Sequence, residues 1–323
     1  MQTYTTAPEL TPSYLDTVWT TLPARIRPTL LLPAQKLSER LGCSVTIASE
    51  TFQFTGSFKF RAAYNLLSSI PHSDIVAASS GNFGQAIAYA SKILGKRCTI
   101  VMPATSAQVK IDAVRSYGGN VDLIDVHKIS RQEGAASHLR THPDAFLAQA
   151  YDDYRVVAGN STLGQEIFAH STFDTVIVPV GGGGLSSGIV LARDHVHADT
   201  EIIGVEPLLG NDAARSLRSG QLVKNEQEPA TIADGARTVS LGQINWEILS
   251  KGLSTIIEVP DPLIVQALRT CFIENNLKVE PTGALSLAAL LAHPERFKGR
   301  RVCCIVSGGN VDPAVYAAAI TQE

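Results

Sequence analysis

The sequence has little net charge, few cysteines and no long apolar run. Its 323 residues carry a net charge of −3, with 18% charged and 45% hydrophobic residues. Such a chain has no basic surface for nucleic acid or for an anionic membrane, and it is too apolar to be disordered. We therefore expect a folded protein that binds small molecules, with neither nucleic acid nor membrane as a partner.

The five cysteines are odd in number and show no C-x-x-C spacing. Cys303 and Cys304 lie within an apolar run that is typical of a strand. This usage indicates buried reduced thiols in a cytoplasmic protein rather than a disulfide framework. The N-terminal residues show no basic start followed by an apolar stretch, so no signal peptide is expected.

Short β-branched runs alternate with amphipathic stretches along the chain. The expected strands are 75–78, 98–102, 121–126, 175–180, 202–205 and 302–306. The expected helices include 85–94, 107–117, 131–140 and 186–192. This order predicts an α/β fold with parallel sheets covered by helices. No linker marks a boundary, so two lobes would be interwoven, with residues 73–151 as a small domain and residues 1–72 and 152–323 as a large one.

One lysine, Lys59, lies in an aromatic turn between Phe58 and Phe60. Desolvation by these rings and repulsion from Arg61 would lower the pKa of its amine and leave more of it as a nucleophile. The alternative is an ordinary surface lysine at the start of a helix.

Three polar loops each follow an expected strand. Residues 181–184 are four glycines, whose free N–H groups at a helix start suit a phosphate. Residues 79–83 gather two hydroxyls and a carboxamide, which suit a carboxylate and a phenolic oxygen. Ser307 opens the third loop, where its hydroxyl could face a ring nitrogen. Each loop also has a purely structural explanation, as a flexible turn or a helix cap.

Five short motifs follow one another along the chain, at residues 57–59, 79–82, 181–184, 280–284 and 307–310. They read Ser-Phe-Lys, Ser-Ser-Gly-Asn, Gly-Gly-Gly-Gly, Glu-Pro-Thr-Gly-Ala and Ser-Gly-Gly-Asn. Together they resemble the motifs of the fold-type II pyridoxal-phosphate enzymes, and within that group the serine/threonine dehydratase and serine racemase family. The resemblance implies a tryptophan synthase β-like fold of two interwoven lobes, each a mostly parallel sheet flanked by helices, and a homodimer.

The resemblance also implies a role for each motif. Lys59 would hold pyridoxal phosphate as a Schiff base and act as the base at the substrate Cα. Ser80 would stand on the opposite face, where racemisation needs a second proton carrier. Cofactor binding would involve Phe58, Asn82, Gly181, Gly182, Gly183, Gly184, Leu185 and Ser307. Substrate binding would involve Ser79, Ser80, Gly81, Asn82, Phe83 and Arg131.

A divalent cation site is implied as well. Glu206 and Asp212 follow an expected strand, with Gly210 between them. Composition alone makes them solvated acids at a helix start. The resemblance instead implies that two carboxylates, the Gly210 carbonyl and waters hold Mg²⁺ or Ca²⁺.

The chain departs from the family pattern at two positions that we expect to border the substrate pocket. Phe83 stands where histidine is usual, and Ala62 stands where glycine is usual. An aromatic wall would admit a larger or apolar β-substituent. Arg131 would favour a second carboxylate, unless it is an ordinary exposed residue of a helix.

The sequence therefore predicts a pyridoxal-phosphate-dependent ammonia-lyase, or dehydratase. Its substrate would be a small β-hydroxy amino acid (serine, threonine, 3-hydroxyaspartate or an aryl-serine), converted to a 2-oxo acid and ammonia. The alternatives are a serine-type or aspartate-type racemase on the same scaffold, and a non-catalytic protein that binds a phosphate ligand.

Overall fold

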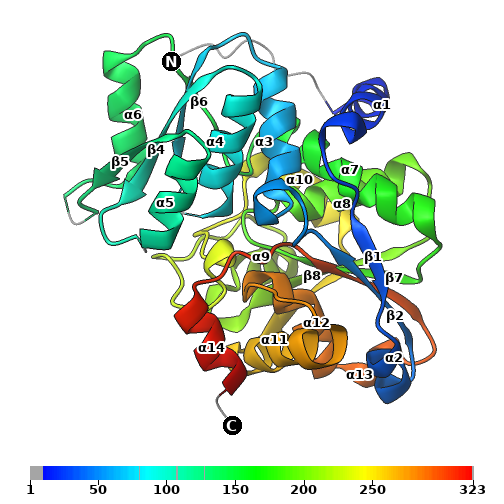
Figure 1. The fold of residues 1–323 in the computed structure, drawn as a ribbon. Helices are drawn as coiled ribbons and strands as arrows, with labels where there is room; N and C mark the ends of the chain where they lie inside the picture. The colour runs from blue at the N-terminus through cyan, green and yellow to red at the C-terminus, as the bar shows by residue number, and fades with distance from the viewer. Residues whose placement is uncertain (1–9, 80, 107, 127, 322–323) are drawn as a thin grey trace.

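The computed structural model describes residues 10–79, 81–106, 108–126 and 128–321 (Figure 1). The strands are β1 (Leu30–Pro33), β2 (Ser44–Ser49), β3 (Asp74–Ala78), β4 (Arg97–Pro103), β5 (Asn120–Ile124), β6 (Phe146–Leu147), β7 (Thr175–Pro179), β8 (Glu201–Pro207), β9 (Thr255–Val259) and β10 (Arg301–Val306). The α-helices are α1 (Pro12–Thr21), α2 (Gln35–Leu41), α3 (Lys59–Ser68), α4 (Asn82–Ile93), α5 (Gln108–Ser116), α6 (Arg131–Thr141), α7 (Tyr154–His170), α8 (Gly184–His195), α9 (Asp212–Ser219), α10 (Gln243–Gly252), α11 (Asp261–Asn275), α12 (Leu285–Ala292), α13 (Pro294–Phe297) and α14 (Pro313–Thr321). The short 3-10 helices are η1 (Pro23–Arg25), η2 (Phe54–Gly56), η3 (Leu208–Gly210), η4 (Asp234–Ala236) and η5 (Thr282–Ala284).

The strands form two sheets. The larger sheet has the order β1-β2-β10-β7-β8-β9, and only its β1–β2 pair is antiparallel. The smaller sheet has the order β5-β4-β3-β6 and is parallel throughout. In Figure 1 the smaller sheet and α4, α5 and α6 lie at the upper left, away from α11 to α14. The predicted α/β class with two mostly parallel sheets is confirmed.

Both sheets are buried on two faces, which explains their nearly continuous apolar strands. In β3 and β4, Ile75 and Ile100 pack on the side of α4 and α5, whereas Val76 and Val101 pack on the side of α6. Side chains of a strand alternate between its two faces, so consecutive apolar residues serve two different cores.

The same rule places the cysteines. Cys303 and Cys304 are adjacent in β10 and enter opposite cores of the larger sheet. All five cysteines are buried and free. The predicted burial of the cysteines is therefore confirmed.

The helices that follow the polar loops begin earlier than the sequence suggested. α4 begins at Asn82 and α8 at Gly184, ahead of the expected starts at 85 and 186. Their first turns, which leave backbone N–H groups without partners inside the helix, therefore belong to the predicted ligand loops.

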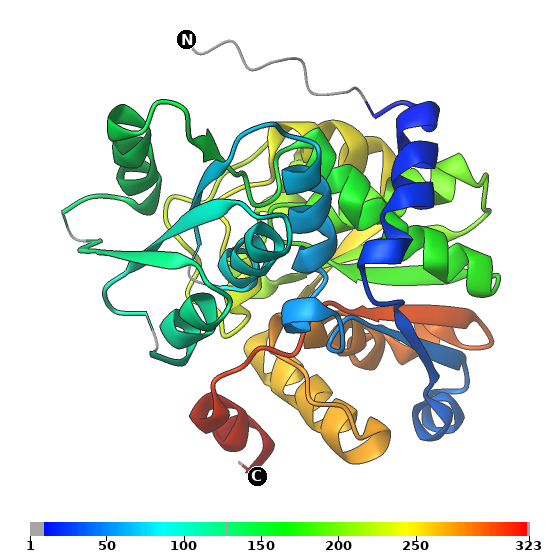
Figure 2. The ribbon, with the colours of Figure 1, turned by 45° about the horizontal axis from the view of Figure 1, so that its top comes forward.

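α3 joins the two lobes. It packs on α4 of the smaller lobe and on α7 of the larger one (Figures 1 and 2). The strands of the smaller sheet lie within 74–147; the domain limits at 73 and 151 stay a prediction. Among the described residues, no helix is long and apolar enough to cross a membrane.

Candidate active site

The predicted loops meet at the carboxyl ends of β3, β7 and β10. This is the end at which parallel α/β sheets leave a crevice for ligands. The first turn of α3 enters the same region, because Ser57 forms a β-bridge with Gly308 and the Phe58 N–H donates to the Ser307 carbonyl at 3.0 Å. The motif that carries Lys59 is thereby fixed to the loop after β10.

Lys59 is the first residue of α3 and is half-buried. Its Nζ donates to the carbonyl of Ala150 at 2.8 Å, and it lies 5.1 Å from the ring centre of Phe58 and 5.6 Å from that of Phe83. Desolvation lowers the pKa of the amine to about 8, and the nearby Glu280 opposes that shift. Near pH 8 about half of the amine is neutral, which makes it both a nucleophile and a proton carrier.

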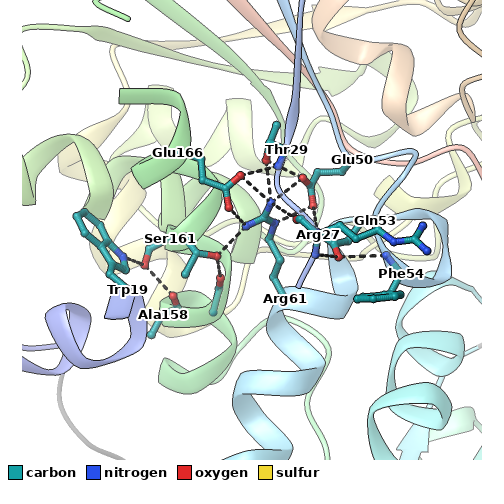
Figure 3. A network of polar contacts seen from close by, with 12 residues as sticks. Trp19, Arg27, Thr29, Glu50, Gln53, Phe54, Arg61, Ala158, Ser161 and Glu166 are labelled. Carbon is teal, nitrogen blue, oxygen red and sulfur yellow. Dashed lines mark hydrogen bonds and ion pairs between the residues drawn. The ribbon is translucent and has the colours of Figure 1, made fainter. Parts of the chain in front are cut away.

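The two residues after Lys59 have other roles than the sequence suggested. Phe60 is fully buried and packs against Phe54 and Tyr89. The Arg61 guanidinium binds the carboxylates of Glu50 and Glu166 (Figure 3), and only desolvation and Glu280 shift the pKa of Lys59. The low pKa of the amine therefore does not come from repulsion by this arginine.

Asn82 lies at the start of α4 in a chain of side-chain hydrogen bonds. Its Nδ2 donates to Glu280 at 2.8 and 3.1 Å, and its Oδ1 accepts a bond from Asn310 Nδ2 at 2.8 Å. Asn310 Nδ2 also donates to the carbonyl of Thr55 at 2.6 Å. These bonds hold the amide of Asn82 in one orientation between the two lobes.

Glu280, the first residue of the motif at 280–284, lies in the site although the sequence predicted no role for it. The residue is 3% exposed, and desolvation followed by the charge of Asp234 raises the pKa of its carboxyl to about 8. The Asn82 bond and the charges of Lys110 and Lys278 oppose the shift. At neutral pH this carboxyl is mostly protonated. In the sequence, this residue could have been noticed as a single acid directly before Pro-Thr-Gly.

The glycine loop connects β7 to α8. Gly183 has φ +92°, a conformation that side-chain-bearing residues rarely adopt. A Cβ at Gly181 would lie 2.9 Å from the Gly235 carbonyl oxygen, and a Cβ at Gly182 would lie 2.3 Å from the ring of Tyr151. The loop is thus packed on both sides, unlike a flexible turn, and it ends at the first turn of an α-helix.

The polar groups of the third loop are enclosed. Ser307 is 2% exposed and directly follows β10. The Ser57 hydroxyl beside it is buried and has no partner among the residues that the structure describes. Leu185, at the start of α8, packs in the core of the larger lobe.

The predicted substrate loop is only partly described, because Ser80 lies outside the described residues. The Ser79 hydroxyl accepts the N–H groups of Gly81 and Gly84 at 3.3 and 3.1 Å and so caps α4. Phe83 is 3% exposed, and its ring lies close to the Lys59 amine. Ala62, which we expected near the substrate, packs instead in the apolar core against α7, so that expectation is wrong.

Arg131 begins α6 in the smaller lobe. Its guanidinium pairs with the carboxylate of Glu228, in the larger lobe, at 3.0 Å, and both side chains are partly exposed. The arginine is thus already bound to a carboxylate that comes from the other lobe.

Glu206 and Asp212 are both 1% exposed, and Gly210 between them is also buried. Glu206 accepts the N–H groups of Ala213 and Ala214 at 3.1 and 2.8 Å. Desolvation, and then the charge of Asp212, holds the pKa of Glu206 well above its usual range. Such a pair of carboxylates is suited to a cation.

Asp212 has one oxygen satisfied and one free. Its Oδ1 accepts a hydrogen bond from Asn225 Nδ2 at 2.8 Å, and no motif in the sequence pointed to Asn225. Its Oδ2 is buried without a partner among the described residues. Desolvation raises the pKa of Asp212 to about 6. No group of three or more His, Cys, Asp or Glu side chains suited to a metal occurs in the described part of the chain.

Comparison with known proteins finds one enzyme family and several similar proteins. The family model described as Pyridoxal-phosphate dependent enzyme matches residues 22–308. The chain is similar to the serine racemase of Schizosaccharomyces pombe, at 37% identity over 91% of this chain and 92% of that protein. It is also similar to the L-threo-3-hydroxyaspartate ammonia-lyase of Pseudomonas sp, at 38% identity over 90% and 92%. Among solved structures, a threonine deaminase from T.th. superposes with a TM-score of 0.88, at 35% identity over 93% of this chain and 98% of that one.

Proposed function

Because the chain belongs to the family of pyridoxal-phosphate dependent enzymes, we propose that it is an ammonia-lyase acting on a β-hydroxy amino acid. The products would be a 2-oxo acid and ammonia. The observation that carries this proposal is the Lys59 amine, which has a pKa of about 8 and lies beside the buried, hydrogen-bonded Asn82–Glu280 pair.

The residues of the site fit pyridoxal phosphate. The glycine loop and the first turn of α8 offer N–H groups to a phosphate without side-chain obstruction. Lys59 offers an amine, Asn82 an oriented amide and Ser307 a buried hydroxyl. When bound, this cofactor supplies an electron-withdrawing ring that makes the Cα proton of an amino acid acidic.

The chain's own groups then have defined tasks. Lys59 would accept the Cα proton, and its lowered pKa keeps the amine able to release that proton again near neutral pH. Glu280 would hold a proton beside Asn82. A serine at position 307 would accept or donate a hydrogen bond without imposing a positive charge on a ring nitrogen, which favours prompt loss of a β-hydroxyl.

Among substrates, we propose 3-hydroxyaspartate first. Two relatives, at 36% and 38% identity, are L-threo-3-hydroxyaspartate ammonia-lyases. Arg131 binds a carboxylate in this structure, that of Glu228, and a second substrate carboxylate could take its place. The apolar face of Phe83 supports an aryl-serine instead. Serine and threonine are the other two candidate substrates.

The test is an assay of 2-oxo acid and ammonia with single stereoisomers of these four substrates, together with the visible absorbance of the protein reconstituted with cofactor. We expect absorbance that is lost in Lys59→Ala, and turnover of one or more substrates. A wild-type protein that stays colourless with added pyridoxal phosphate would exclude the enzyme and leave the non-catalytic phosphate-binding alternative.

Racemisation is the second candidate function, since a serine racemase is 37% identical to this chain and Ser80 stands at the position to which the family resemblance assigns a second proton carrier. Incubation with one enantiomer of serine or aspartate, followed by chiral analysis, separates the two activities. Racemisation through Ser80 predicts that Ser80→Ala abolishes formation of the opposite enantiomer and retains some elimination.

We also propose that Mg²⁺ or Ca²⁺ binds at Glu206, Asp212 and the Gly210 carbonyl. The buried Asp212 Oδ2, which has no partner among the described residues, supports this site.

We propose a homodimer on the family resemblance, and a cytoplasmic location on the five free, buried cysteines. Light scattering of the purified protein tests the dimer: a mass of one chain would contradict it.

A further inference from the structure

Tyr151 lies against the glycine loop, at a point that no motif marks. A Cβ added to Gly182 would lie 2.3 Å from Cγ, 2.4 Å from Cδ2 and 2.5 Å from Cδ1 of this tyrosine. Real Cβ atoms do not approach other atoms so closely, so the ring covers the face of Gly182 from which a side chain would project. Gly182, unlike Gly183, does not have a positive φ, so it is the ring and not the backbone conformation that leaves room only for glycine at position 182.

Three consecutive residues attach this segment to the site. The Ala150 carbonyl accepts the hydrogen bond of Lys59 Nζ at 2.8 Å. Asn245 Nδ2 donates to the carbonyls of both Tyr151 and Gly182, at 3.0 and 2.8 Å. The Asp152 carboxylate accepts two N–H groups in the first turn of α10, each at 3.0 Å. Tyr151 is therefore held in place from both sides, between the lysine and the glycine loop.

The phenol is suited to a place beside a phosphate. Burial, together with Asp152 and Asp212, raises the pKa of Tyr151, and Arg131 opposes this shift. The ring thus stays neutral in the physiological range and adds no negative charge. Its apolar face also keeps water from one side of the loop, and hydrogen bonds to an anion are stronger where water is excluded.

We propose that Tyr151 is a positioning residue for the cofactor phosphate: its ring forms the wall that holds Gly182 and shields the glycine loop, and its segment ties that loop to Lys59. This inference rests on the proposed use of pyridoxal phosphate. It adds a residue, outside the glycine motif, on which the shape of the phosphate site depends.

The test compares the equilibrium affinity of the cofactor-free protein for pyridoxal phosphate in four proteins: wild type, Gly182→Ala, Tyr151→Ala and the double variant. Gly182→Ala forces its methyl group into the ring, so we expect affinity to fall by about tenfold or more. Tyr151→Ala removes the ring and should weaken binding several-fold. The double variant should recover most of the loss caused by Gly182→Ala, because the methyl group then has room.

Two control variants test whether the effects come from the ring of Tyr151. Tyr151→Phe keeps the ring and should bind like wild type, with an unchanged phosphorus NMR signal of the bound cofactor. Gly184→Ala places its Cβ 3.1–3.2 Å from the carbonyl oxygen, Cα and Cβ of Tyr151, atoms that alanine retains. Its defect should therefore not be rescued by Tyr151→Ala.

Circular dichroism and melting of each cofactor-free variant establish that it is folded. The inference is overturned if Tyr151→Ala binds the cofactor as tightly as wild type, or if the double variant binds no better than Gly182→Ala. Should Gly182→Ala fail to fold, the comparison of Tyr151→Ala with Tyr151→Phe decides alone. A wild type that does not bind the cofactor would instead remove the proposed function, so the two failures are distinguishable.

Discussion

At the scale of single residues, the reactivity of the site depends on two desolvated groups, one basic and one acidic. Lys59 is an amine with a pKa lowered to about 8, and Glu280 is a carboxyl with a pKa raised to about 8. Desolvation is the largest cause in both, because burial disfavours the charged form of either group. Shifting both pKa values toward neutral pH costs stability and lets the two groups exchange protons in the physiological range.

The first prediction concerns Lys59→Met in the cofactor-free protein. The folded-state pKa lies below the ordinary value of 10.5, so burial of this amine costs stability in full below pH 8, and the cost fades as the pH rises to 10.5. At pH 7 the variant should be more stable than wild type, by on the order of 2 kcal/mol. Chemical denaturation at pH 7 and pH 10 measures this: the gain should shrink at pH 10, and equal gains at both values would refute the electrostatic explanation.

The second prediction concerns Phe83, whose ring centre lies 5.6 Å from the Lys59 amine. Phe83→His replaces an apolar wall with a polar one and should shift kcat/KM toward serine and threonine, relative to an aryl-serine, by about tenfold. Steady-state kinetics with this pair of substrate types provides the readout. Tyr89→Phe, in the neighbouring aromatic cluster, is the control and should leave the ratio unchanged. An unaltered preference in Phe83→His would remove Phe83 from the substrate pocket.

At the scale of elements, α3 depends on a buried arginine. Arg61 is fully buried and donates to Glu50 at 2.8 and 2.9 Å and to Glu166 at 2.8 and 3.2 Å (Figure 3). It also donates to Thr29 and Thr162. Since Lys59 is one half-turn earlier on the same helix, this network fixes the start of α3 relative to β2 and α7.

The third prediction follows from that network. Arg61→Lys keeps the charge and loses the planar, bidentate geometry, so it should destabilise the protein by about 3 kcal/mol. Denaturant titration gives the value. Arg97→Lys is the matched control: it breaks an equally bidentate pair with Asp74, at 2.7 and 2.6 Å, that is exposed, so the loss of stability should be much smaller. Equal losses in the two variants would contradict the importance of burial.

At the scale of the whole molecule, two ion pairs among the described residues join the two lobes. Arg131 on α6 binds Glu228 at 3.0 Å, and Lys110 on α5 binds Asp234 at 2.6 Å. Both acids belong to the segment after α9, which also supplies Asn225 to Asp212. The small lobe, through Arg131 and Lys110, and the proposed cation site are therefore connected through one segment.

The fourth prediction concerns Glu228→Gln. If a substrate carboxylate replaces this acid at Arg131, removing the competing charge should lower KM for 3-hydroxyaspartate by a few-fold and leave KM for serine unchanged. Kinetics with both substrates tests this. The same change in KM for both would show that Arg131 does not read a second carboxylate.

The fifth prediction concerns the cation. Chelation should lower the melting temperature by several degrees, and Mg²⁺ or Ca²⁺ should restore it, since a ligand that binds only the folded state stabilises it. Asp212→Asn should abolish this response, whereas Glu295→Gln, an exposed acid on α13, should retain it. A melting curve that is indifferent to chelator and cation would refute the site.

The α/β class, most strands and the motifs could be predicted from local patterns, because alternating apolar runs and glycine-rich turns are local properties of the chain. The sequence could not assign roles to Glu280 or Tyr151, since neither residue type is unusual where it stands. Only the folded chain brings these residues to the site: Glu280 is buried against Asn82, 198 positions away in the chain, and the Tyr151 ring lies on Gly182. Burial and close approach depend on which distant loops meet, and that is set by the packing of two sheets rather than by any local pattern.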